Sequence, residues 1–143
     1  GEHLYIPAGL AHAIGAGHLI AEIQQNSDTT YRLYDWNRTD DSGRGRELHL
    51  EQALDSIGEF RELSQRPGYL TEMPYFTTKE YRLDKGERFT QPDSSRFAVF
   101  TVLCGSVLWD GKTARKGEFI LSPAGADAVT AAEADTVLLS TTV

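Results

Sequence analysis

The chain has 143 residues, of which 40% are hydrophobic, and a formal net charge of -7. This length allows one compact domain, or one small domain and part of another, but not two ordinary domains. The negative charge argues against a nucleic-acid partner, since phosphate backbones require clustered Lys and Arg, and no apolar run approaches the ~20 residues that cross a bilayer.

The first 36 residues alternate between apolar and polar side chains in the manner of β-strands. The strands are expected at residues 1–6, 19–25 and 29–36. In the second of them, Glu22 and Gln24 share one face, because successive side chains of a strand point to opposite sides. Residues 38–46 are polar and rich in glycine, which predicts a loop.

A short helix and a linker are expected next. The helix is indicated by apolar residues at helical spacing, namely Leu50, Ala53, Leu54 and Ile57, with Gly58 as its end. Residues 60–68 read as a linker punctuated by Pro67 and Gly68.

Strands are predicted again in the second half of the chain. They are expected at residues 75–83, 97–103, 106–109, 119–121 and 136–141. Glycine-containing turns separate them at the spacing of a small antiparallel sandwich or barrel. The only cysteine, Cys104, cannot form an internal disulfide and lies among apolar residues, so we expect a buried structural thiol and a cytoplasmic protein.

An internal repeat links the two halves. The first copy consists of Gly1-Glu2, four further residues and Pro7-Ala8-Gly9. The second copy has the same pattern, with Gly117-Glu118, four further residues and Pro123-Ala124-Gly125. In this register His12 of the first copy stands opposite Ala128 of the second. Two copies of one strand-turn unit predict two related barrels, and the polar side chain at this position, His12, is kept only in the first.

The string Gly1-x5-Pro7-Ala8-Gly9-x2-His12 resembles the second sequence motif of the cupin superfamily. The sequence departs from this motif at Ala16, where asparagine is frequent. The resemblance implies a mainly β, cupin or jelly-roll fold, the double-stranded β-helix, with a short helical linker. We therefore expect the C-terminal strands of a partial catalytic barrel at 1–46, a helical connector at 47–70 and a complete, metal-free second barrel at 71–143.

Residues 22–36, together with Arg46-Glu-Leu-His49 and the following helix, resemble the short bacterial class I mannose-6-phosphate isomerases. In that family, mannose 6-phosphate and fructose 6-phosphate interconvert by proton transfer beside a bound zinc. The zinc ligands are a glutamine or equivalent, two histidines and a glutamate. His12 matches the last of these histidines and Arg32 the active-site arginine, which implies that the remaining ligands lie upstream of this chain.

The residue types agree with that chemistry. A neutral imidazole is a good zinc ligand, and a catalytic zinc keeps an open position for substrate oxygens. A permanently charged arginine can stabilise the charge of an enediolate. Glu22 could move a proton or orient a hydroxyl, although a structural role is equally open. Arg32 could instead pair with Asp28 or Asp35.

The other histidines are not expected to bind metal: His3 begins the chain, His18 follows a flexible turn and His49 opens the helix. The aromatic cluster of Tyr31, Tyr34 and Trp36 indicates barrel packing first and a sugar-stacking wall second. The expected partner is a sugar-phosphate substrate, with no nucleic acid and no membrane.

Because a partial barrel would expose unpaired strand edges, association with another chain through these strands is also expected. The chain by itself is expected to be inactive.

Two other functions remain open. A metal-free cupin module that binds or senses a sugar would have no need for Glu22 and Arg32 facing a metal-ligand histidine. A different cupin enzyme, such as a metal-dependent oxygenase, would need two or three histidines around one iron. Only His12 is suitably placed for that role.

Overall fold

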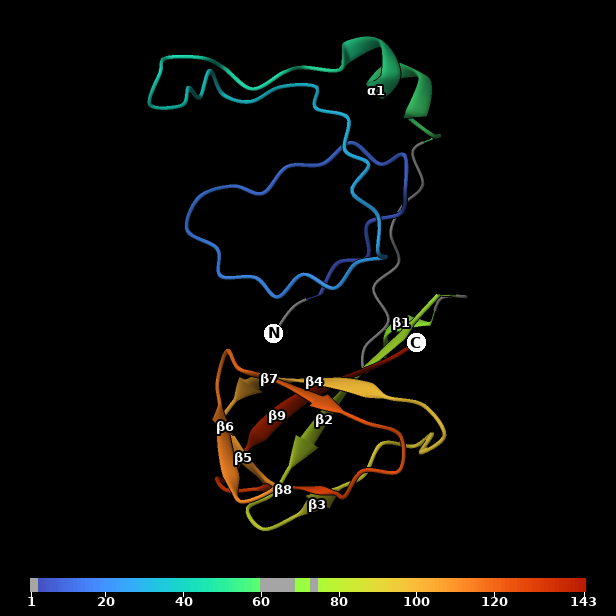
Figure 1. Cartoon of the computed structure of the whole chain (residues 1–143), viewed down its shortest axis with the longest axis vertical. Helices are drawn as coiled ribbons and strands as arrows, with labels where there is room; N and C mark the ends of the chain where they lie inside the picture. The colour runs from blue at the N-terminus through green and yellow to red at the C-terminus, as the bar shows by residue number, and fades with distance from the viewer. Residues whose placement is uncertain (1–2, 60–68, 73–74) are drawn as a thin grey trace. The chain divides into compact units, whose positions relative to one another are not determined.

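The computed structural model describes residues 3–59, 69–72 and 75–143, and these form one helix and nine strands. The chain divides into two compact units. One is Ile6–Leu63, and the other is Ser64–Val143 together with Gly1–Tyr5. All the labelled strands lie in the green-to-red, C-terminal part of the chain (Figure 1).

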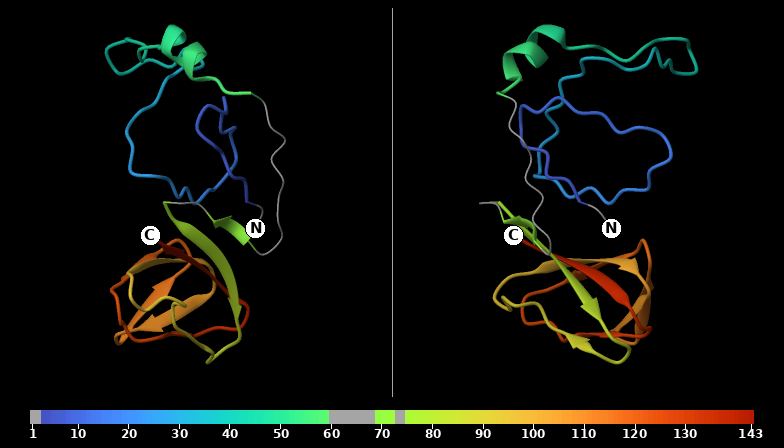
Figure 2. Two further views of the ribbon diagram at one scale, coloured as in Figure 1. Left: turned by 90° about the vertical axis from the view of Figure 1, so that its right-hand side faces the viewer. Right: turned by 180° about the vertical axis from the view of Figure 1, so that it is seen from behind.

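The C-terminal unit contains two antiparallel sheets. The strands are β1 (Tyr69–Glu72), β2 (Thr77–Leu83), β3 (Arg88–Phe89), β4 (Ala98–Cys104), β5 (Ser106–Trp109), β6 (Lys112–Arg115), β7 (Phe119–Ser122), β8 (Val129–Ala131) and β9 (Thr136–Thr142). One sheet has the order β1-β2-β9-β4-β7 and the other β3-β8-β5-β6. The two sheets face each other across a common interior (Figure 2).

The strand pairing is nested. β2 pairs with β9, β3 with β8, β4 with β7 and β5 with β6, so the chain from β2 to β9 is one long hairpin folded over itself. Eight strands paired in this way and divided between two sheets form a jelly roll, the architecture of cupins. The expected fold class is therefore confirmed.

The hydrophobic core lies between the two sheets. Along β4, Ala98, Phe100 and Val102 are buried, because alternate side chains of the strand point to the inner face. The ring of Phe89 lies 5.5 Å from that of Phe100 and 4.3 Å from that of Tyr81. Each large apolar side chain buried here contributes about 1.5–3 kcal/mol to folding.

Five strands were expected in this half, and the structure places all five within two residues of the predicted ends. Four were missed: β1, β3, β6 and β8. β3 has only two residues, and β6 is the polar segment Lys-Thr-Ala-Arg, so neither carries an apolar alternation. Their position follows from long-range pairing rather than from local pattern. The expected linker at 60–68 lies outside the described residues.

The prediction of a buried Cys104 is wrong, because the structure exposes this side chain. The pairing of β4 with β9 shifts register between Val102 and Cys104. Such a bulge adds a residue to one strand and changes which side chains face the interior. Val102 stays in the core, and Cys104 turns to the surface.

The N-terminal unit contains the helix α1 (Leu50–Ser56), where the sequence predicted one. The expected strands are not formed in the described part of residues 1–36. A strand exists only where its backbone groups find a partner in register, and the described residues before α1 contain one isolated bridge, between Thr39 and Gly45.

Apolar side chains of this unit remain exposed. Between residues 6 and 59, which are all described, only Asp35 and Ala53 are buried. Leu19 is 91% exposed and Trp36 is 55% exposed, so the barrel packing expected for the aromatic cluster is not present. Within the described part of the chain, no helix has the length and apolar character that a membrane span requires.

Candidate functional site

The two copies of Pro-Ala-Gly form the same turn. In the first copy the amide of Leu10 donates to the carbonyl of Pro7 at 3.2 Å, and Gly9 has a φ of 84°. In the second copy the amide of Ala126 donates to the carbonyl of Pro123 at 3.2 Å, and Gly125 has a φ of 70°. A positive φ at the third position is the requirement that glycine meets in a type II turn.

The strands before the two turns differ. The repeat places residues 3–6 opposite Phe119–Ser122, which is β7 and pairs with β4. Residues 3–6 form no strand. The internal repeat is thus confirmed in the geometry of its turn and not in its strand, and Gly1 and Glu2 lie outside the described residues.

The first turn is packed against the end of α1. The amide of Gly58 donates to the carbonyl of Gly9 at 3.0 Å. A Cβ atom on Gly9 would lie 2.8 Å from the carbonyl oxygen of Ser56, closer than real Cβ contacts. A cavity of about 350 Å³ opens here, lined by Pro7, Ala8, Gly9, Leu10, Gly58 and Glu59.

His12 follows this turn and is exposed. Its Nδ1 lies 2.9 Å from the carbonyl oxygen of Leu10. A carbonyl can only accept, so Nδ1 carries a proton, and in the neutral ring Nε2 then keeps its lone pair. Metal-binding histidines commonly have this arrangement, in which a backbone carbonyl fixes the tautomer and orients the ring. His12 therefore fits one donor position of a metal site.

Arg32 is half-buried and fixed at three points. Its amide donates to Nδ1 of His49 at 3.2 Å, and its carbonyl accepts from the amide of His49 at 2.9 Å. Its Nη1 donates to the carbonyl of Glu47 at 3.2 Å.

The alternative that Arg32 pairs with Asp35 is not realised. Arg46 holds that carboxylate with both arms of its guanidinium, Nε donating to Oδ2 at 2.7 Å and Nη2 donating to Oδ1. Asp35 is only 6% exposed. The hydrogen bond from Arg46 lowers the pKa of Asp35, the positive charges of Arg46, Arg32 and Arg38 lower it further, and burial acts in the opposite direction.

The structure does not assemble a complete metal site. Glu22 is exposed, and no hydrogen bond or ion pair among the described residues connects it with His12 or Arg32. Within the same residues, no group of three or more His, Cys, Asp or Glu side chains could hold a metal ion. His12 is therefore a candidate ligand without a complete donor set in the described part of the chain.

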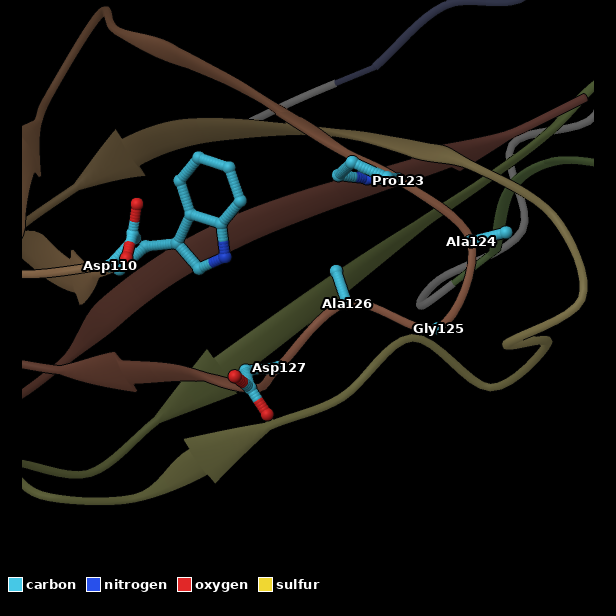
Figure 3. A pocket seen from close by; sticks show the side chains of 7 residues that line it. Asp110, Pro123, Ala124, Gly125, Ala126 and Asp127 are labelled. Carbon is cyan, nitrogen blue, oxygen red and sulfur yellow. The ribbon is translucent and has the colours of Figure 1, made fainter.

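The second copy of the turn also lines a cavity, of about 220 Å³, together with Trp109, Asp110 and Asp127. Figure 3 shows the side chains around it. The counterpart of His12 is Ala128, and residues 71–143 contain no histidine. This barrel therefore has no histidine at the position equivalent to His12.

Known proteins resemble the chain over most of its length. It is 34% identical over 137 residues to the mannose-6-phosphate isomerase of Streptococcus mutans. The aligned region covers 86% of this chain and 43% of that protein. Over 57 residues it is 56% identical to mannose-6-phosphate isomerase ManA of Bacillus subtilis, covering 40% of this chain and 18% of ManA. No protein-family model matches the chain.

A solved structure agrees with these sequences. The crystal structure of the mannose 6-phosphate isomerase from Bacillus subtilis superposes with a TM-score of 0.64 and 26% identity, over 82% of this chain and 41% of that one. The chain thus spans less than half the length of the relatives that it matches. The sequence resemblance is confirmed, and the chain is homologous to part of the mannose-6-phosphate isomerases.

Proposed function

We propose that the chain is the C-terminal portion of a cytoplasmic mannose-6-phosphate isomerase, and that it acts on a sugar phosphate only as part of the longer protein. The proposed reaction interconverts mannose 6-phosphate and fructose 6-phosphate by proton transfer between neighbouring carbons. The observation that carries this proposal is the 34% identity to the Streptococcus mutans isomerase over 86% of the chain.

The proposed domain organisation keeps the sequence-based boundaries. Residues 1–46 belong to the catalytic barrel, 47–70 connect it to the second barrel, and 71–143 form a structural barrel without metal. The exposed apolar side chains of the N-terminal unit support this division. Exposed apolar surface of this extent marks a place where other protein packs.

Three side chains carry the proposed chemistry. His12 binds zinc through Nε2, with the other ligands supplied by residues upstream of this chain. Such a zinc polarises substrate oxygens. Arg32 stabilises the negative charge that develops on the enediolate oxygens, because it is permanently charged and held in a fixed position. Glu22 moves the proton or orients a substrate hydroxyl.

A second candidate is a metal-free cupin module that binds a sugar. It is favoured by the absence of a metal-holding cluster among the described residues and by the complete second barrel without histidine. Such a module would bind sugar without turnover and without metal.

The test is mannose 6-phosphate turnover and zinc content in the intact protein that contains this chain. Arg32→Ala should lower turnover by roughly two orders of magnitude or more while zinc stays bound, because charge stabilisation in the transition state is lost. Arg115→Ala, an exposed arginine in the C-terminal unit, is the matched control and should leave both unchanged. Near-normal turnover in Arg32→Ala would remove this residue from the site.

His12→Ala in the same protein separates the two candidate functions. We expect zinc content and turnover to fall together, because one of about three protein ligands is lost. Zinc retained in full by His12→Ala would reassign His12 to a structural role. An intact wild-type protein that binds the sugar without zinc and without turnover would favour the binding module.

A further inference from the structure

We infer that His49 is a positioning residue for Arg32, an inference that rests on the proposed role of Arg32 in the isomerase. The two residues are 17 positions apart in sequence and are joined by two hydrogen bonds. The amide of Arg32 donates to Nδ1 of His49 at 3.2 Å, and the amide of His49 donates to the carbonyl of Arg32 at 2.9 Å.

The first of these bonds defines the chemical state of the imidazole. An amide nitrogen can only donate, so Nδ1 of His49 must accept, and the proton of the neutral ring is on Nε2. Nε2 in turn lies 4.0 Å from a carboxylate oxygen of Glu47. The ring is only partly exposed, with 25% of the side chain accessible, and it lies 6.2 Å from the ring of Tyr31.

Helix capping does not account for this side chain. His49 is the N-cap residue of α1, but it makes no side-chain capping hydrogen bond. The residues preferred for capping are Ser, Thr, Asp and Asn, because their short side chains accept from the first amides of the helix. The imidazole of His49 instead accepts from Arg32, so its direct partner is the candidate catalytic residue.

The consequence is a fixed Arg32. The backbone of Arg32 is held by His49, and its guanidinium is held by the carbonyl of Glu47, two residues before His49. Without an acceptor at position 49, the half-buried amide of Arg32 would lose its partner, which costs free energy. The guanidinium would then sample positions away from the charge that it stabilises, and small displacements of such groups lower the rate strongly.

Two substitutions distinguish this role from general support of the fold. In His49→Asn the side-chain oxygen is two bonds beyond Cβ, as Nδ1 is in histidine, so the acceptor for the amide of Arg32 is kept. In His49→Gln the oxygen is one bond further out, and the acceptor is displaced. Glu51→Gln, on the exposed first turn of α1, is the control for changes in helix stability.

In the intact protein, His49→Gln should lower kcat by about tenfold to a hundredfold with little change in KM or zinc content. His49→Asn and Glu51→Gln should stay within about twofold of the wild-type kcat, a change too small to signal misplacement of a catalytic group. A kcat of His49→Gln equal to that of the wild type would overturn the inference. Equal losses in His49→Asn and His49→Gln would do the same, since both would then reflect structural support.

A second measurement does not depend on activity. The ¹⁵N shifts of the His49 ring in the 143-residue chain should show a protonated Nε2 and an unprotonated Nδ1, and His49→Gln should assign the signals. A protonated Nδ1 would overturn the contact with Arg32. An inactive wild-type protein with the expected tautomer would contradict the proposed function while leaving the contact itself established.

Discussion

The carbonyl of Gly9 accepts a hydrogen bond from the amide of Gly58 at 3.0 Å. The turn that carries the candidate metal ligand is therefore attached to the residue that follows α1 and its C-cap, Ile57. The approach is close enough that Gly9 has no room for a side chain on the side facing Ser56. The turn that precedes His12 is thus held by the end of α1 as well as by its own hydrogen bond.

Gly9→Ala should release this turn from the end of α1. The new Cβ would meet the carbonyl oxygen of Ser56 at 2.8 Å, and Gly9 has a positive φ of 84°. Hydrogen exchange of the Gly58 amide measures the effect. We expect this exchange to become roughly tenfold faster or more, because the open state becomes tenfold more populated when the free energy of local opening falls by about 1.4 kcal/mol.

Gly17→Ala is the matched control for that measurement. Gly17 has a φ of 83°, but a Cβ there would meet nothing within 4 Å. The control therefore includes the backbone strain without the collision. Equal exchange of the Gly58 amide in the two variants would show that the contact with Ser56 does not hold the turn.

In the C-terminal unit, Gly105→Ala should destabilise the barrel more than Gly111→Ala. Both glycines have a φ of 70°, so both substitutions introduce the same left-handed strain. Only at Gly105 would the Cβ collide, 2.5 Å from Oγ1 and 3.1 Å from Cα of Thr136. We expect an additional loss of about 1–3 kcal/mol in the free energy of unfolding, typical of overpacking. Denaturant unfolding measures it, and equal losses would contradict the close approach to Thr136.

Arg46→Gln should raise the pKa of Asp35 toward its ordinary value, because the hydrogen bond from Arg46 is the largest cause that lowers it. A carboxyl whose pKa is lowered in the folded state stabilises that state above its unfolded pKa, near 3.8. This stabilisation is lost as the pH falls through the lowered pKa. A ¹³C titration of the Asp35 carboxyl in both proteins checks the shift, and an unchanged pKa in Arg46→Gln would reject the pairing as its cause.

The sequence predicted the second barrel well where turns and alternation agree. β5 was predicted with its observed ends, because Gly105 and the Asp110-Gly111 turn bracket it. Asp110 and Gly111 have φ values of 47° and 70°, as a type I′ hairpin requires. β3 and β8 are short segments, distant in sequence, that pair as neighbours in one sheet, and no local pattern reveals this pairing.

The N-terminal strands were predicted from alternation alone. Alternation indicates which face a strand would bury, but not whether a partner strand is present to pair with it. Leu19 illustrates this, since it fits a strand pattern and yet is almost fully exposed. Among the described residues this segment pairs with no strand, and its structure is irregular.

The candidate site was predicted in part. The motif identified His12, and the structure adds the tautomer that leaves Nε2 available. The sequence indicated that His49 opens the helix, which is correct. Its contact with Arg32 could not be predicted, because it joins residues from different segments. The pairing of Asp35 with Arg46 was missed for the same reason, although both residues stand within the segment that resembles the isomerases.

We propose that this chain contributes His12 and Arg32 to a site that other residues of a longer protein complete. The most direct measurement is mannose 6-phosphate turnover, compared at equal concentration between the purified 143-residue chain and the intact protein with zinc. We predict turnover by the intact protein and none by the chain alone, because one histidine does not make a catalytic zinc site with about three protein ligands. Turnover by the chain alone at the rate of the intact protein, or no turnover by either, would contradict the claim.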